Sequence, residues 1–289
     1  NLSVIYDYKA LRKSLSRKSL KAGTERSLWR YLAILPLDGR AGIAPVAVGW
    51  TPLYHARMLG AGLGLKRLYL KDDGRNPSAS FKDRASAVIA ARAFQTKEKT
   101  VAGASTGNAA ASLACMMAQR DAKPVIFVPR SAPAAKLAQL LIYGAVVFSV
   151  DGNYDEAFDL CRKACDEFGW YNRNTGYNPF TREGKKTCAF ELCEQLDWKV
   201  PDFVFVPVGD GNIISGIWKG FTDFHALGLI DKLPKLVAVQ AQGSDAIARA
   251  LKNDGAIRPV SGKTIADSIS VSLPRDGAAA VQAVTQSRG

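Results

Sequence analysis

The residue best placed for chemistry is Lys82, in the segment NPSASFKDRASAVIAARA at residues 76–93. Asn, Pro and Ser residues typical of turns and N-caps precede it and an Ala-rich stretch follows, which predicts a helix beginning near Phe81. The positive end of that helix lowers the pKa of an ammonium group in its first turn. Because a neutral amine forms Schiff bases, this lysine suits attachment to an aldehyde. The alternative is an exposed lysine followed by Asp83 and Arg84 as helix-surface charges.

Two further turns have the composition of anion-binding loops. A predicted strand ends at Gly103 and is followed by ASTGN (residues 104–108) and an apolar helix. A second predicted strand, residues 203–208, is followed by GDGN (residues 209–212) and another helix. Backbone amides at such helix starts are unpaired and bind anions, and glycine lets the backbone approach a phosphate closely. Three strand, turn and helix units in one chain favour a ligand site more than any one of them alone.

The elements that must position these loops alternate along the chain, which predicts an α/β fold of parallel sheets flanked by helices. Strands are expected near 67–71, 100–103, 124–128, 145–149, 203–208 and 235–240. Helices are expected near 82–95, 107–119, 133–142, 153–168, 182–196 and 212–226. Residues 169–182, rich in Asn, Tyr, Gly and Pro, are expected to form a long loop that acts as a hinge or lines the site.

The motifs NPSASFKDR, ASTGN and PVGDGNIISG resemble the lysine, substrate and phosphate loops of fold-type II pyridoxal phosphate enzymes. Outside them, SLWRY (27–31), LP (35–36), GWTPL (49–53), LYLKDD (68–73) and IWKGF (217–221) are similar in order and spacing to the threonine synthase family. The resemblance runs from about Tyr6 to the end of the chain. The lysine motif is specific and the GDGN loop less so.

The resemblance implies a role for each motif residue. Lys82 would hold pyridoxal 5'-phosphate as a Schiff base, and Asn108 would bond the phenolic oxygen of its ring. The cofactor phosphate would be wrapped by Gly209, Asp210, Gly211, Asn212 and Ile213. The substrate carboxylate would be received at a helix start by Ser105, Thr106 and Gly107. Lys71, at a strand end, would meet a substrate phosphate.

The fold implied is two-lobed and similar to the tryptophan synthase β subunit, with the cofactor in the cleft between domains. Residues 82–179 would form a small domain nested in a large one made of residues 1–81 and 180–289. Closure of the small domain would exclude water. Ser78, Ala79 and Ala85 replace a Thr, a Gly and a Gly of the usual string NPTGSFKDRG, and since all are small we expect no obstruction. We expect the match to lack the family's C-terminal part, which holds the contact to the pyridine nitrogen.

The activity implied is that of a phosphate-releasing carbon-oxygen lyase of threonine biosynthesis, which converts O-phospho-L-homoserine and water to L-threonine and phosphate. A β-replacement or β-elimination enzyme, such as a cysteate synthase or a threonine or serine dehydratase, would share the lysine and both loops. An inactive homologue that binds a polyanion is the alternative from another class. Other classes are poorly supported, because Ile257 breaks the Walker loop before Gly262 and Gln240 stands where a ribose-binding acid is expected.

Composition fits a soluble enzyme of the cytoplasm, or of an organelle after removal of a transit peptide, without membrane spans. The net charge of +13 includes eight basic residues within residues 9–30. Few aromatics interleave them, so we expect a solvated helix face and no specific nucleic-acid binding. The five cysteines lack the spacing of a disulfide framework or a metal site, which predicts free thiols and no metal. A homodimer is a family expectation.

Overall fold

The computed structural model describes residues 2–105, 107–118, 120–262 and 264–289. Its strands are β1 Leu53–His55, β2 Tyr69–Lys71, β3 Thr100–Ala104, β4 Lys123–Pro129, β5 Val146–Val150, β6 Tyr171–Asn172, β7 Phe203–Pro207 and β8 Lys235–Val239. Its α-helices are α1 Tyr8–Leu11, α2 Arg17–Ala22, α3 Arg57–Gly62, α4 Asp83–Gln95, α5 Asn108–Met117, α6 Ala134–Ile142, α7 Tyr154–Phe168, α8 Phe180–Gln195, α9 Asn212–Ala226, α10 Ala246–Lys252 and α11 Gly277–Ser287. Three short 3₁₀ helices span Leu28–Ile34, Asp73–Arg75 and Asp267–Ile269.

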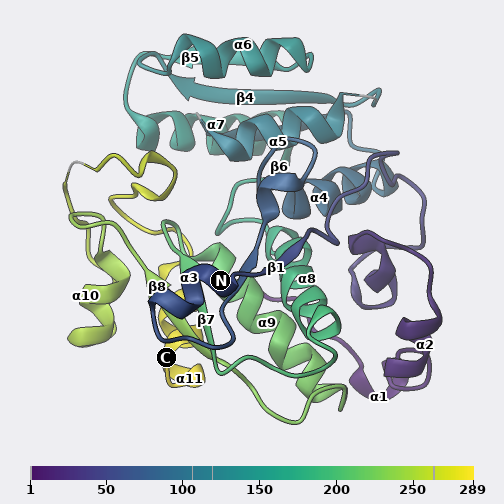
Figure 1. Cartoon of the computed structure of the whole chain (residues 1–289). Helices are drawn as coiled ribbons and strands as arrows, with labels where there is room; N and C mark the ends of the chain where they lie inside the picture. Colours follow the sequence, from purple (N-terminus) through teal and green to yellow (C-terminus); the bar gives the residue numbers. More distant parts are fainter. Residues whose placement is uncertain (1, 106, 119, 263) are drawn as a thin grey trace.

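A parallel sheet of four strands, in the order β5-β4-β3-β6, forms the upper part of the molecule in Figure 1. Successive side chains of a strand point to opposite faces of its sheet. Val101 of β3 and Ile126 of β4 accordingly pack with α4 and α5, while Ala102 and Val125 pack against α7. Helices therefore cover both faces, as expected for a parallel sheet.

The lower part of the molecule is built on the helix pair α8 and α9, with α11 beside α9 (Figure 1). The two helices approach closely at Gly220 of α9, because a Cβ there would lie only 2.3 Å from the carbonyl oxygen of Lys186. Phe190 and Phe224 stack in this core with ring centroids 4.0 Å apart, and the ring of Tyr31 packs against both at tilted or edge-on angles. A second parallel pair, β7 and β8, lies next to these helices.

The predicted alternation of strands and helices is confirmed, with boundaries that differ by three residues or fewer. The elements before residue 67 and after residue 240 were not expected. One of them, β1, pairs with β2 in an antiparallel ladder, which adds an antiparallel pair to the expected parallel sheets. The expected loop at 169–182 contains β6 and the first residues of α8.

All five cysteines are free, as predicted, and four of them are buried. Among the described residues, no helix is both long and apolar enough to span a bilayer.

Candidate active site

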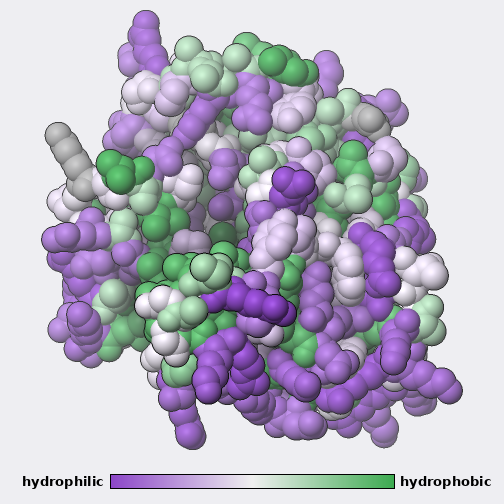
Figure 2. All heavy atoms as spheres, in the orientation of Figure 1, coloured by the Kyte–Doolittle hydropathy of each residue, from purple (hydrophilic) through white to green (hydrophobic). Residues whose placement is uncertain are grey.

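The carboxyl ends of two parallel strands and the amino ends of several helices enclose a cavity of about 420 Å³. The strands are β3 and β7, the helices are α5, α7 and α9, and residues 267–273 line one side. Figure 2 shows a recess near the middle of the face drawn there. Ligands of open α/β sheets bind at this end of the strands, and the volume suits a small molecule.

Most of the residues that the sequence predicts for the site line this one cavity. They are Lys82, Ser105, Gly107, Asn108, Gly209, Asp210, Gly211, Asn212 and Ile213. Thr106 lies outside the described residues. Loops separated by about a hundred residues in the chain are therefore brought together around Lys82.

Lys82 occupies the N-cap position of α4, where its amide donates a hydrogen bond to the Ser80 hydroxyl (3.1 Å). Its pKa lies below the ordinary value of 10.5, first because of burial and then because of the charge of Arg173, with Asp210 acting in the opposite direction. The helix end, from which the sequence predicts a lowered pKa, is present, and burial and the charge of Arg173 lower the pKa of Lys82 as well. A lysine of this kind reaches the neutral, nucleophilic form at lower pH.

The two residues after Lys82 are fully buried, so the alternative of helix-surface charges is wrong for them. The Asp83 carboxylate accepts hydrogen bonds from the amide (2.7 Å) and hydroxyl of Ser78, which closes the loop in front of Lys82. Within this loop Ala79 has a φ of +56°. An L-residue pays about 1 kcal/mol or more in that left-handed region, so the loop tolerates strain where the family string has Gly.

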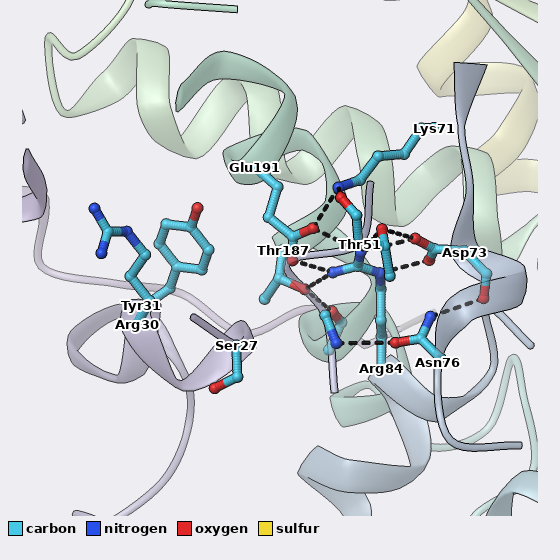
Figure 3. Close-up of polar contacts among 12 residues, drawn as sticks. Ser27, Arg30, Tyr31, Thr51, Lys71, Asp73, Asn76, Arg84, Thr187 and Glu191 are labelled. Atoms are coloured by element: carbon cyan, nitrogen blue, oxygen red, sulfur yellow. Dashed lines mark hydrogen bonds and ion pairs between the residues drawn. The ribbon is translucent and has the colours of Figure 1, made fainter. Parts of the chain in front are cut away.

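Arg84 is the centre of an ion network that fixes the start of α4 (Figure 3). Its guanidinium donates to both carboxylate oxygens of Asp73 (2.6 and 2.8 Å) and to both of Glu191. Further bonds run to the hydroxyls of Thr51 (3.2 Å) and Thr187 (3.0 Å). Burial is the largest single influence and raises the pKa of both carboxyls, but the charge and hydrogen bonds of Arg84 together with the charge of Lys71 hold each pKa below its ordinary value.

Lys71 belongs to this network and does not line the cavity. Its ammonium donates to Glu191 (2.6 Å), to the carbonyl of Thr51 (2.7 Å) and to the side-chain oxygen of Gln195 (2.9 Å). These three acceptors use all three donors of an ammonium group. The placement gives no support to the prediction that Lys71 meets a substrate phosphate.

Two anion-binding helix starts face the cavity. Gly107 and Gly211 hold the N-cap positions of α5 and α9, and no side chain of the described residues caps either helix. Gly211 has a φ of +92°, and a Cβ there would lie 2.8 Å from the carbonyl oxygen of Asp276, so the turn requires glycine. The free amides of both helices and their dipoles are consequently available to anions.

Asn212, the first residue of α9, fixes the second of these turns. Its side-chain amide donates to Asp276 (2.8 Å), and its side-chain oxygen accepts from Lys185 (2.5 Å) and Thr181 (3.3 Å). Asp210, two residues earlier, is also held in place, because its carboxylate accepts a hydrogen bond from the backbone amide of Arg275 (3.0 Å). Burial raises the pKa of this aspartate.

Two buried cations of the cavity were missed by the sequence reasoning. Arg173 follows β6 in the segment expected to line the site, but it was not predicted to be a site residue. Lys185 lies in the string REGKK, which has the look of a surface charge run. The signal that could have found it is the helical spacing that places it one turn after Thr181, on the face that packs on α9.

The cavity residues fit pyridoxal phosphate. Lys82 supplies an amine of lowered pKa for the aldehyde, and the uncapped start of α9 supplies amides for the phosphate. The loop before α9 is tightly packed, since a Cβ on Gly209 would lie 3.1 Å from the Cα of Ile269. Asn108 also faces the cavity and carries an amide that can bond the ring. The donor set thus matches an aldehyde with a dianionic tail.

Comparison with known proteins gives consistent results. A family model described as "Pyridoxal-phosphate dependent enzyme" matches residues 45–289. The threonine synthase of Methanocaldococcus jannaschii is 42% identical, with 100% of this chain and 71% of that protein covered. The threonine synthase of Methanosarcina acetivorans is 40% identical, with 100% and 70% covered. The structure of processed threonine deaminase isoform 2 from Solanum lycopersicum is similar at a TM-score of 0.71 and 25% identity, covering 83% of this chain and 65% of that one.

These matches confirm the predicted fold-type II class, in which helices flank a parallel sheet. They also confirm pyridoxal 5'-phosphate as the cofactor of the family. The chain spans about seven tenths of the length of the two archaeal relatives. It belongs to the pyridoxal-phosphate dependent enzymes and, among them, to the threonine synthase family.

Proposed function

We propose that the protein is a threonine synthase that converts O-phospho-L-homoserine and water into L-threonine and phosphate. The observation that carries the proposal is the 42% identity to a threonine synthase over the whole chain. It is supported by the cavity in which Lys82 and both anion-binding helix starts meet. A lysine of lowered pKa next to two anion sites suits a cofactor with an aldehyde and a phosphate together with a substrate that carries a carboxylate.

Each motif residue takes one task in this reaction. When bound, the cofactor stores the negative charge that develops on the substrate carbons. Lys82 binds the cofactor aldehyde and, once the substrate amino group has replaced it, its neutral amine moves protons at Cα and Cβ. Asn108 holds the ring, and the amides of residues 209–213 hold the cofactor phosphate. The amides of residues 105–107 receive the substrate carboxylate. Phosphate leaves from Cγ, Cγ then gains a proton to become the methyl group of threonine, and water adds at Cβ.

The domain division is part of the proposal. Residues 82–179 comprise α4 to β6 and would move as a small domain, while residues 1–81 and 180–289 form the large one. Lys82 lies at the boundary and the cavity is lined from both sides of it. Closure around the bound substrate would exclude water until the addition step. The cytoplasmic location and the homodimer stay predictions.

The experiment is to incubate the cofactor-loaded protein with O-phosphohomoserine and to measure phosphate and threonine together. Equal amounts of both products are expected, with loss of turnover in Lys82→Ala. Phosphate without threonine would contradict the proposal in favour of elimination alone. Conversion of serine or threonine to a keto acid, without phosphate release from O-phosphohomoserine, would indicate a dehydratase. Absence of any cofactor absorbance would favour the inactive homologue.

A further inference from the structure

Two cations are buried in the wall of the cavity without the partners that buried charges require. Arg173 is 3% exposed and Lys185 is 2% exposed, and they come from the segment after β6 and from α8. Both line the same cavity as Lys82. Burying a charge costs several kcal/mol unless it is paired and hydrogen-bonded. The structure therefore holds two cations in a costly position, each next to open space.

Within the described part of the chain, the Arg173 side chain has no hydrogen bond and no carboxylate at ion-pair distance, and its Nε has no partner. Packing fixes its stem instead. A Cβ on Gly103 of β3 would lie 2.7 Å from Cδ of Arg173, so the absence of a side chain at Gly103 makes room for the arginine. Burial lowers the pKa of Arg173 to about 10, which leaves it cationic at neutral pH. The fork of a guanidinium fits a phosphate with two parallel hydrogen bonds.

Lys185 has one hydrogen bond among the described residues, to the side-chain oxygen of Asn212 (2.5 Å). An ammonium has three donors, so two remain for a ligand. Burial lowers the pKa of Lys185 well below its ordinary value, and the charges of Lys82 and Arg173 lower it further, whereas Asp276 and Asp210 oppose the shift. An anion bound beside this amine would raise its pKa again and so stabilise its charged form.

The other anions of the reaction already have receptors in the proposed function. The uncapped start of α9 takes the cofactor phosphate, and the uncapped start of α5 takes the substrate carboxylate. One anion remains, the phosphate ester that the substrate carries and the reaction releases. We propose that Arg173 and Lys185 together form the receptor for this phosphate and so select phosphorylated substrates. This inference rests on the proposed function for the identity of the substrate.

The test compares two ligands of equal chain length on the cofactor-loaded protein. The first is 2-amino-5-phosphonopentanoate, in which a methylene replaces the ester oxygen of O-phosphohomoserine, and the second is 2-aminopentanoate, which lacks the phosphonate. In Arg173→Gln and in Lys185→Gln, we expect the dissociation constant of the phosphonate to rise at least about tenfold, while that of 2-aminopentanoate changes less than about threefold. Arg173→Lys keeps a cation and is expected to recover part of the affinity.

Lys136→Gln is the matched control, because Lys136 lines the same cavity but is paired with Asp267 (2.7 Å) and is 38% exposed. It should change the phosphonate dissociation constant by less than about threefold, since a paired and exposed cation adds little. An equal effect in the control would overturn the proposal, because it would show general attraction by positive charge and no receptor.

Two further outcomes would also overturn it. Equal weakening of both amino acids would mean that Arg173 and Lys185 only support the cavity wall. Loss of affinity for pyridoxal phosphate, with affinity for unphosphorylated pyridoxal unchanged, would assign the pair to the cofactor phosphate. The proposed function fails separately: it fails if the wild-type protein releases no phosphate and threonine from O-phosphohomoserine, even when the pair binds the phosphonate.

Discussion

Two regions of the protein each bury an arginine, but the two arginines differ in how many hydrogen bonds their side chains make. In the network at the start of α4, Arg84 makes six hydrogen bonds to carboxylates and hydroxyls (Figure 3). In the cavity, the Arg173 side chain makes none among the described residues. The first charge is balanced within the fold, whereas the second is left for a ligand. The difference separates cations that hold the structure from cations that serve binding.

The same contrast occurs between two consecutive lysines of α8. Lys186 is fully buried and paired with Glu183 (2.7 Å) and Asp223 (2.8 Å). Lys185, buried to the same extent, faces the cavity and has only the neutral Asn212 as a hydrogen-bond partner. Because residues one apart on a helix face in different directions, one side of α8 serves the core and the other serves the site.

The largest effect is expected for Arg84→Met, which leaves Asp73 and Glu191 as buried carboxylates without their main partner. We expect the free energy of unfolding to fall by about 3 to 5 kcal/mol, as measured by urea denaturation. Arg162→Met is the control, because Arg162 forms an exposed ion pair with Asp166 (3.5 Å) on α7. Its loss should cost less than about 1 kcal/mol. Similar values for the two variants would show that the network does not hold the fold.

Next in size is the difference between Lys186→Gln and Lys185→Gln in the ligand-free protein. Removing Lys186 takes away the shortest ion pair of two buried acidic groups and leaves them Lys219 at 3.7 and 3.2 Å, so we expect a loss of about 3 kcal/mol. Removing Lys185 costs one hydrogen bond but also relieves the burial of a group whose charged form is disfavoured, so we expect a change within about 1 kcal/mol. Thermal unfolding of both variants measures the difference. Equal destabilisation would contradict the assignment of Lys185 to ligand binding.

A smaller effect on the free energy of unfolding is expected from a change of pH. Asp73 and Glu191 have folded-state pKa values below their ordinary values of 3.8 and 4.5, so the native state binds fewer protons in acid than the unfolded chain. Their contribution to the free energy of unfolding is complete above those ordinary values and is lost as pH falls through the lowered pKa values.

Two lysines that line the cavity determine how the free energy of unfolding depends on pH on the alkaline side. Lys82 and Lys185 have pKa values below 10.5 when folded, so the unfolded chain binds more protons and stability rises as pH rises toward 10.5. Urea unfolding of the ligand-free protein from pH 3 to 10 would show both limbs. Arg84→Met should flatten the acid limb only. A variant profile parallel to that of the wild type would contradict the account.

Local patterns in the sequence were enough to predict the alternating elements and the loops that face the cavity. Lys82 and the turns at 103–108 and 209–212 were found because strand, turn and helix signals lie next to each other in the chain. Ion pairs between residues far apart in the chain could not be predicted from the sequence. Glu191, which binds Lys71, lies 120 residues away from it, so Lys71 was expected at a ligand. Only the folded structure shows which buried charges have partners, and therefore Arg84 and Arg173 could not be distinguished beforehand.

The most direct test of the account is to find which lysine carries the cofactor, because Lys82 and Lys185 line one cavity and both have lowered pKa values. The cofactor-loaded protein would be reduced with borohydride, digested and analysed by mass spectrometry. We predict the added cofactor mass on the peptide that contains Lys82 and none on the peptide that contains Lys185. Label on Lys185, or on neither lysine, would contradict the assignment on which the proposed mechanism and the phosphate receptor both depend.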